Sequence, residues 1–431
     1  MKKLIFKTML IALFCLSTAC TCNKGECENK PKELTGTLDG YYDGKEVSAS
    51  MRRYIEQWNQ TEPSQNEFYT SFSYQTMKGL NYEEGISRRD PSTVIKIEDT
   101  YYVYYTRSPK TIAPVGYKKA TKEIPANTWD MCDIYYATSK DGKTWEEKGI
   151  AAARGPEGEF DDRSVFTPDI MAYKGKYYLY YQAVKFPYTE RSKNVIGMSW
   201  SDSPTGPWHR YPKPVLVSGK PGKFGKDSEK RSNITEYGDF DSQKVHDPNL
   251  IVRDGKIWMY YKAHPMGVGS EHDAPRGVGL KKPYPNFSMG VAIADGPEGP
   301  FIKHPLNPIS ASGHEALVWP YKDGVASMIT ANGPEKNTIQ WAKDGVNFEV
   351  KANIVLPPDA AGLYCPDKYD DTKNGQGFTW GVCHIAQSKS KPWAYLIGFK
   401  CDLSQGIENL NHKRENIRFD EESRKKSTTR K

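Results

Sequence analysis

A unit of apolar strands recurs along the chain from residue 86 onward. Each copy begins with a polar residue ahead of an apolar run, passes a small turn and continues into an aromatic strand, as in RRDPSTVIKIEDTYYVYYTRS from Arg88 to Ser108. A second hairpin, with Asp-Gly or Gly-Pro at its turn, follows the strand. The polar residues that open the copies, which we name the markers, are Asp90, Asp169, Asp247, the pair His314 and Glu315, and Asp367.

The spacing of the markers predicts the architecture. They stand at positions 90, 169, 247, 314 and 367, which are 79, 78, 67 and 53 residues apart. A unit of this length holds four strands with their loops, and four-stranded units repeated radially form a β-propeller. An open array of sandwich domains has the same periodicity, but no linker-like stretch separates the units. The pattern therefore predicts an all-β protein, a five-bladed β-propeller.

An N-terminal helical extension is predicted ahead of the repeats. From Ser48 to Gln60, the apolar residues Met51, Tyr54, Ile55 and Trp58 recur at spacings of three and four, which is typical of an amphipathic helix. An apolar stripe needs a partner surface. We therefore predict a homodimer through this segment, and the alternative is a helix that packs on its own propeller.

The two ends of the chain lie outside the repeats. Basic Met1–Lys3, the apolar run Leu4–Leu16 and Cys20 are typical of an export signal, with either a lipid on Cys20 or simple cleavage nearby. We expect an exported protein, in the periplasm or at the outer membrane as a lipoprotein, with membrane contact only through the lipid anchor. The predicted layout is a signal peptide at 1–20, a leader at 21–45, the helical extension at 46–85, the propeller at 86–410 and a basic tail at 411–431.

Charge and composition narrow the partner. The formal net charge is +7, of which Lys2, Lys3 and Lys7 contribute +3 and residues 411–431 contribute +4, so the body between is formally neutral. A neutral body argues against nucleic acid, whose phosphates are bound by clustered Lys and Arg. Aromatic residues make up 12% of the chain; most of them should fill strand positions, but they also suit stacking on sugar rings. The eight cysteines include no zinc-ligand spacing, and we expect buried free thiols in the body.

The markers carry candidate chemistry. In a propeller the first strand of each blade lines the central channel, so residues at its start converge on one pocket. A ring of carboxylates suits sugar hydrolysis, which needs a proton donor and a base or nucleophile on opposite faces of the sugar. Asp before Pro also caps turns, so a structural role is the alternative for each marker, and we expect it for Asp169 and Asp367.

Three short motifs resemble glycoside hydrolase family 117: SRRDPS at 87–92, HDPN at 246–249 and GHEA at 313–316. The resemblance spans roughly residues 46–400. It implies an exo-acting α-1,3-(3,6-anhydro)-L-galactosidase that cleaves neoagarobiose and longer agar-derived oligosaccharides from the non-reducing end. The family also exchanges an N-terminal helix between two subunits through a Ser-x-Ala-x-x-Arg signature. Here Ser50 replaces the expected Ala in the stretch from Ser48 to Arg53.

The same resemblance implies roles for single residues. Asp90 would be the general base of an inverting reaction, and Asp247 would tune the acid or hold the sugar. The acid would lie in the pair His314 and Glu315, with His314 favoured. Further positions that match the sugar pocket of the family are Trp129, Thr167, Gln182 and His246.

Two other functions stay possible on the sequence. The first is a different propeller glycosidase, such as an arabinanase or xylosidase. The second is a non-catalytic glycan-binding surface lipoprotein, against which the clustered Asp90, Asp247 and His314 argue. No metal-ligand cluster is visible, and a mostly water-held divalent cation in the central channel is the one possible cofactor.

Overall fold

The computed structural model describes residues 46–55, 66–108, 112–189, 192–224, 234–236, 238–266, 285, 287–386, 388 and 390–405. The predicted signal peptide, leader and basic tail lie outside these ranges, as does the end of the predicted helix from residue 56. Within the described residues, regular structure is almost entirely β-strand, which confirms the all-β prediction. None of these residues belongs to a helix long and apolar enough to cross a bilayer.

Three antiparallel sheets follow one another along the chain. Their residues alternate or run apolar over lengths typical of buried strands. The first sheet has β2 (Ser87–Arg89), β3 (Ile95–Ile97), β4 (Thr100–Ser108), β5 (Asp133–Ser139) and β6 (Trp145–Ala152). The second has β7 (Ser164–Tyr173), β8 (Lys176–Val184), β9 (Val195–Ser201) and β10 (His209–Arg210). The third has β13 (Lys244–Arg253), β14 (Lys256–His264), β15 (Ser288–Ala294) and β16 (Ile302–Lys303).

The remaining strands form an eight-stranded sheet and a separate ribbon. One half of the large sheet has β17 (His314–Lys322), β18 (Gly324–Ala331), β19 (Thr338–Ala342) and β20 (Glu349–Asn353). The other half has β1 (Ser73–Thr76), β21 (Gly362–Leu363), β22 (Gly375–Ile385) and β23 (Tyr395–Ser404). The halves are joined into one sheet where the ends of β17 and β22 pair, at Tyr321↔Gln376 and Lys322↔Gly375. The ribbon consists of β11 (Lys223–Phe224) and β12 (Ile234–Glu236).

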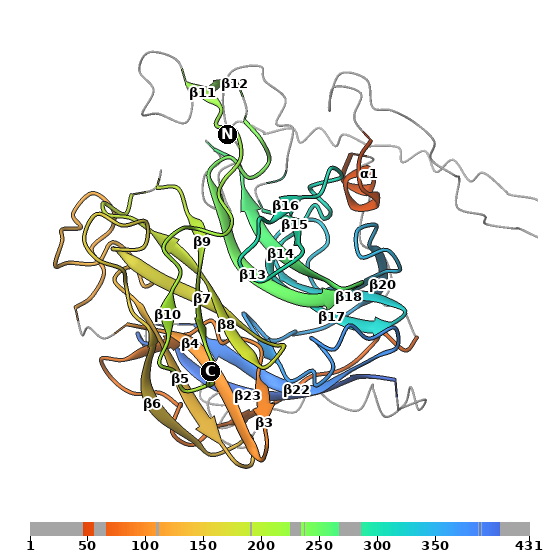
Figure 1. Cartoon of the computed structure of the whole chain (residues 1–431), viewed down its shortest axis with the longest axis horizontal. Coiled ribbons are helices and arrows are strands. Elements are labelled where there is room, and N and C mark those ends of the chain that lie inside the picture. The colour runs from red at the N-terminus through yellow and green to blue at the C-terminus, as the bar shows by residue number, and fades with distance from the viewer. Residues whose placement is uncertain are drawn as a thin grey trace, which may run out of the picture.

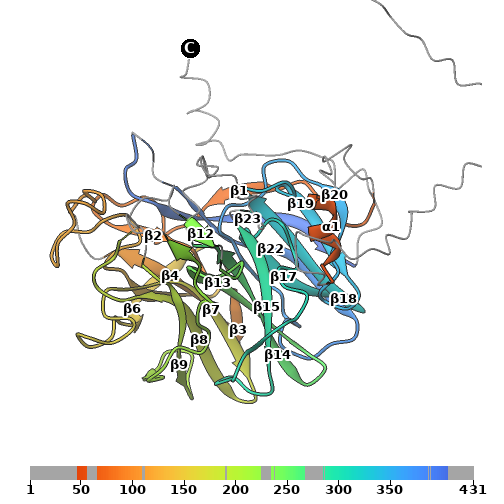
Figure 2. The ribbon, with the colours of Figure 1, turned by 90° about the horizontal axis from the view of Figure 1, so that it is seen from above.

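The sheets are arranged in chain order around a common centre, so that the last strands return to the first (Figures 1 and 2). Strand β1, from the predicted N-terminal extension, pairs antiparallel with β23 from Ser73↔Lys400 to Thr76↔Ile397. A parallel bridge between Val94 and Tyr364 joins the first sheet to the last. The N-terminal strand therefore completes a sheet made from the C-terminal part of the chain, which covers an edge that would otherwise be exposed.

Helix α1 (Ala49–Ile55) lies within the predicted helix and packs on the fourth group of strands of its own chain. The backbone N–H of Met51 donates to Ser48 Oγ, which caps the helix. Ser50 Oγ and Arg53 Nε donate to the buried carboxylate of Glu335, at 2.6 and 2.8 Å. Met51 is fully buried within the same chain, so part of the predicted stripe already has a partner surface, as the alternative held.

A buried ammonium joins the inner strands. Lys368 is 0% exposed, and its Nζ donates to Thr93 Oγ1 at 2.5 Å, Asn249 Oδ1 at 3.1 Å and Asp169 Oδ2 at 3.4 Å. Asp169 also accepts the backbone N–H groups of Thr93 and Leu250, and Asn249 accepts that of Val318. We name the group of Lys368, Asp169, Asn249 and Thr93 the hub. Through these bonds, the part of the chain that carries Lys368 is joined to the other four groups of strands.

The four body cysteines are free, three of them buried: Cys132, Cys365 and Cys383, with Cys401 partly buried. This agrees with the expectation of free thiols.

Replacing Lys368 tests the hub. Lys368→Met leaves the Asp169 carboxylate buried without its cation, and we expect the free energy of unfolding to fall by about 3–5 kcal/mol. Lys373→Met is the control, because Lys373 forms an exposed ion pair with Asp254, and such pairs contribute about 1 kcal/mol or less. Urea unfolding measures both. Equal losses in the two variants would contradict the role of the hub.

Candidate active site

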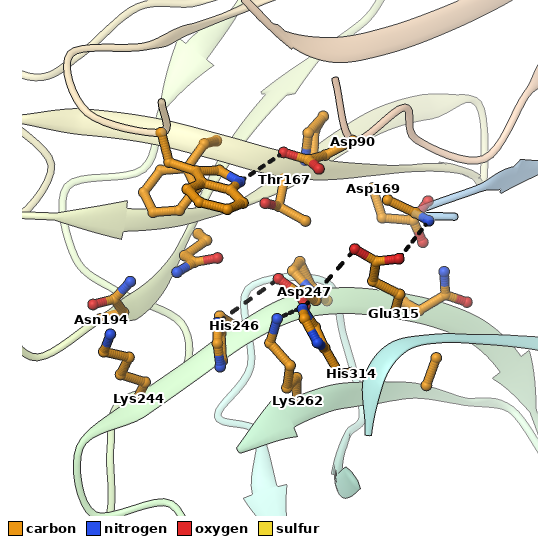
Figure 3. A pocket seen from close by; sticks show the side chains of 18 of the residues that line it. Asp90, Thr167, Asp169, Asn194, Lys244, His246, Asp247, Lys262, His314 and Glu315 are labelled. Atoms are coloured by element: carbon orange, nitrogen blue, oxygen red, sulfur yellow. Dashed lines mark hydrogen bonds and ion pairs between the residues drawn. The ribbon is translucent and has the colours of Figure 1, made fainter. Parts of the chain in front are cut away.

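A cavity of about 490 Å³ opens at the centre of the ring of sheets. It is lined by the starts of β7, β13 and β17, by the segment after β2 and by that before β21. All eight residues that the sequence suggested as catalytic or sugar-binding line it: Asp90, Trp129, Thr167, Gln182, His246, Asp247, His314 and Glu315. Figure 3 shows part of this set, with Asp90 and His314 on opposite sides of the cavity.

A strained backbone position recurs at the start of each inner segment. Asp90, Thr167, Asp247 and Glu315 have φ values of 50°, 49°, 51° and 55°, and Ala360 has 41°. The ladder register shifts beside it, between Phe166 and Asp169 in β7 and between His246 and Asn249 in β13. A bulge re-aims a side chain, and left-handed non-glycine residues cluster at functional sites. Each of these five residues lines the cavity.

This register corrects two of the sequence markers. Thr167 and Ala360, rather than Asp169 and Asp367, occupy the positions equivalent to Asp90. Asp169 lies two residues further along and caps backbone N–H groups in the hub, as expected. Asp367 lies in a turn, where it accepts the N–H of Gln376 and does not line the cavity. The sequence does not distinguish an Asp at the position equivalent to Asp90 from an Asp two residues later, in the hub. The bulge in the strand decides between them.

Asp90 is held as a carboxylate by cations and N–H donors. Arg89 Nε and Trp129 Nε1 each lie 3.1 Å from Oδ2, and His384 Nδ1 lies 3.2 Å from Oδ1. The guanidinium of Arg89 also stacks on the Trp129 ring, 3.8 Å from its centroid. Burial raises the pKa of Asp90, but Arg89, His384 and Lys262 together outweigh burial and lower that pKa well below its ordinary value. Asp90 is therefore ionised at neutral pH.

Asp247 pairs with a buried lysine. Lys262 Nζ forms an ion pair with Asp247 Oδ2, and His246 Nδ1 lies 3.8 Å from Oδ1 (Figure 3). Burial lowers the pKa of His246 well below its ordinary value, and the neighbouring cations Lys262 and Lys244 lower it further. The imidazole of His246 is therefore neutral at neutral pH.

His314 and Glu315 form a pair that can move a proton. His314 Nδ1 is hydrogen-bonded to Asn332 Oδ1, and the His314 ring stacks on Phe287 with centroids 4.9 Å apart. An amide oxygen only accepts hydrogen bonds, so Nδ1 donates to Asn332 Oδ1. Nε2 lies 3.9 Å from Glu315 Oε1, while Glu315 Oε2 accepts the N–H of Ala360 at 2.9 Å.

Sequence reasoning missed three residues that shape this site: Arg89, Lys262 and His384. Arg89 lies next to Asp90 in sequence and could have been found from that adjacency. Lys262 and His384 lie on β14 and β22, the second strands of their groups, whereas the markers stand only at the start of each unit. His384 approaches Asp90 across 294 positions of the chain, and no local pattern signals such a contact.

The hub does not suit a divalent cation. The oxygens of Asp169, Asn249 and Thr93 that would coordinate an ion already contact the ammonium of Lys368, and like charges repel at this separation. Among the residues that the structure describes, no group of three or more His, Cys, Asp or Glu side chains could hold a metal.

Replacing Trp129 tests the environment of Asp90. A carboxyl whose pKa is lowered on folding contributes stability above its unfolded pKa of about 3.9 and loses that stability as the pH falls through the folded value. Trp129→Phe removes one N–H donor, so the variant should be less stable at pH 7 by about 1.5–3 kcal/mol. This deficit reflects the difference between the folded pKa values of Asp90 in the two proteins, so it should persist below about pH 4 and shrink only as the pH falls through the lowered folded pKa of Asp90 in the variant.

Trp258→Phe is the matched control, because its buried indole N–H has no hydrogen-bond partner among the described residues. Its deficit should be the same at every pH. Thermal unfolding of both variants from pH 7 down to the lowest pH at which the wild type stays folded measures the difference, and a Trp129→Phe deficit no larger than that of Trp258→Phe at pH 7 would show that the indole does not stabilise the Asp90 carboxylate.

Comparisons with known proteins identify the family. The family model described as glycosyl hydrolases family 43 matches residues 86–228. No curated protein sequence matches the chain. A solved structure described as a glycoside hydrolase is 15% identical, with a TM-score of 0.51 over 87% of this chain and 99% of that one, a likeness that shows the fold alone. Zg3597, a family 117 glycoside hydrolase produced by the marine bacterium Zobellia galactanivorans, is 41% identical, with a TM-score of 0.66. That match covers 80% of this chain and 94% of that one, so the chain belongs to glycoside hydrolase family 117.

Proposed function

We propose that this glycoside hydrolase releases 3,6-anhydro-L-galactose from the non-reducing end of neoagarobiose and longer neoagaro-oligosaccharides, with inversion at the anomeric carbon. The observation that carries the proposal is that an ionised Asp90 and the adjacent pair His314 and Glu315 line one cavity. We further propose that the three separate sheets and the two halves of the large sheet are the five blades of a propeller, because each contains at least four antiparallel strands.

Asp90 is the proposed base. Its carboxylate takes a proton from water as the water oxygen bonds to the anomeric carbon, and the bond from that carbon to the glycosidic oxygen breaks. His314, in its imidazolium form, gives the Nε2 proton to the departing oxygen, and Glu315 at 3.9 Å stabilises the imidazolium before transfer. Asp247, neutralised by Lys262, holds the sugar.

A different propeller glycosidase is the second candidate, favoured by the family 43 match over residues 86–228. Incubation with neoagarobiose, an arabino-oligosaccharide and a xylo-oligosaccharide separates the two. Release of anhydrogalactose from neoagarobiose alone supports the proposal, and release of arabinose or xylose alone contradicts it. Proton NMR of the first product tests the mechanism: a retained anomer would make Asp90 a nucleophile.

We also propose export and a homodimer in which α1 is exchanged between copies, on the strength of the N-terminal sequence and the family signature. Exchange would give each subunit the contacts of Ser50 and Arg53 with Glu335 from the other copy. Light scattering of chains with and without residues 1–65 tests the dimer. A truncated chain that stays dimeric would exclude α1 as the interface.

Base and acid variants differ in how they respond to the leaving group. Asp90→Asn should lower turnover by about 10²–10⁴-fold on every substrate, because water must be deprotonated in each case. His314→Gln should show a similar loss on neoagarobiose but largely retain activity on an aryl glycoside, because an aryl oxide leaves without protonation.

Glu315→Gln is the matched comparison. If Glu315 is the donor, the substrate-dependent loss should appear in Glu315→Gln and not in His314→Gln. Steady-state rates on the two substrates decide between them, and full activity of both variants on neoagarobiose would show that the acid lies elsewhere.

A further inference from the structure

Four basic side chains form a square on one face of the hairpin β13–β14. Lys244 stands directly opposite His264, and His246 stands directly opposite Lys262. Residues that are opposite each other across an antiparallel pair, and residues two apart along a strand, share one face of a sheet. All four line the central cavity. We name these residues the basic square.

The basic square is unfavourable for folding alone. Burying amines and imidazoles costs free energy unless they are paired or hydrogen-bonded, and His246, Lys262 and His264 are each only 7% exposed. One carboxylate, Asp247, is shared by Lys262 and His246. Burial lowers the pKa of His246, and the neighbouring cations Lys262 and Lys244 lower it further, so both ammonium groups act on this wall of the cavity.

The proposed reaction leaves part of this square unused. Lys262 neutralises Asp247, but the mechanism assigns nothing to Lys244, His264 or the Nε2 of His246. His246 Nε2 is buried and has no hydrogen-bond partner among the described residues, although a buried polar atom of this kind normally has one. The amides of Gln182 and Asn194 line the same part of the cavity, and Figure 3 shows Asn194 next to Lys244.

We propose that the basic square binds an anionic substituent, a sulfate ester or a carboxylate, on the sugar that enters the cavity. Lysine, neutral histidine and amide side chains all supply N–H donors, and an oxyanion accepts several of them at once. Charge-assisted hydrogen bonds are about twice as strong as neutral ones. The substrate would then be a charged galactan oligosaccharide. The hydrolysis of this substrate rests on the proposed function, whereas its binding does not.

Calorimetry with the full chain carrying Asp90→Asn tests the proposal without turnover. The ligands are neoagarobiose, the same disaccharide with one sulfate ester at each galactose hydroxyl in turn, and a disaccharide bearing one uronate carboxylate, all at one ionic strength. At least one anionic ligand should bind about 10–100-fold more tightly than neoagarobiose, which is the value of one or two hydrogen bonds to a charged group. The sulfated and carboxylated ligands distinguish the two sources of charge.

Lys244→Gln and His264→Gln, each in the same background, should lower the ratio of anionic to neutral affinity by about 10-fold. Lys256→Gln is the matched control, since Lys256 is on the same strand at the far end and pairs with Asp295 at the exposed surface. Its ratio should be unchanged. Equal affinities for all ligands, or a ratio that neither variant at the square changes, would overturn the proposal.

Hydrolysis of neoagarobiose by the unmodified chain separates this outcome from failure of the proposed function. If the chain hydrolyses neoagarobiose but binds anionic ligands no more tightly than neutral ones, the anion site is excluded and the proposed reaction is supported. If the chain binds an anionic ligand more tightly but releases anhydrogalactose from none of the ligands, the anion site is supported and the proposed reaction is excluded.

Discussion

The ammonium of Lys368 lies where no solvent reaches it, and the first three groups of strands supply its neighbours Thr93, Asp169 and Asn249. A buried charge is stable only when it is paired and hydrogen-bonded. Asp169 and Asn249 meet that condition while also accepting backbone N–H groups from adjacent strands. Because burial lowers the pKa of Lys368 and Asp169 opposes this, the ammonium and its carboxylate must assemble together. The relative position of the inner strands follows from this one constraint.

The orientation of two cavity residues depends on hub residues that follow two positions later in the sequence. Thr167 and Asp247 stand two positions before Asp169 and Asn249, and each has a left-handed backbone. Such a conformation costs about 1–2 kcal/mol in an ordinary residue and persists only when the surrounding structure fixes it. The hub fixes the strand on one side of the bulge, and the side chain before the bulge is consequently aimed into the cavity. A rigid centre thus orients the groups that would contact a sugar.

Charges within the cavity are separated by position. On one side Asp90 receives its cation from Arg89 beneath it, and on the other Asp247 receives its cation from Lys262 within the basic square. Asp90 therefore stays ionised, whereas His246, surrounded by cations, stays neutral. A site that must both accept and donate protons needs such different environments for its titratable groups. Neither environment can be inferred from the marker residues alone, because Lys262 and His384 come from other strands.

Local pattern determined the strands and, in three of the five groups, the polar residue at the start of the group, because apolar periodicity and turn residues act over a few positions. It therefore predicted Asp90, Asp247, His314 and Glu315 as neighbours in space. Tertiary structure decided which residue takes the position equivalent to Asp90, because a one-residue bulge that the sequence does not reveal places Thr167 there and leaves Asp169 bonded within the hub. It also decided the partners of Asp90, since His384 meets it only when the last sheet closes against the first. Closure of the ring is a long-range property, and its contacts join residues that no local pattern connects.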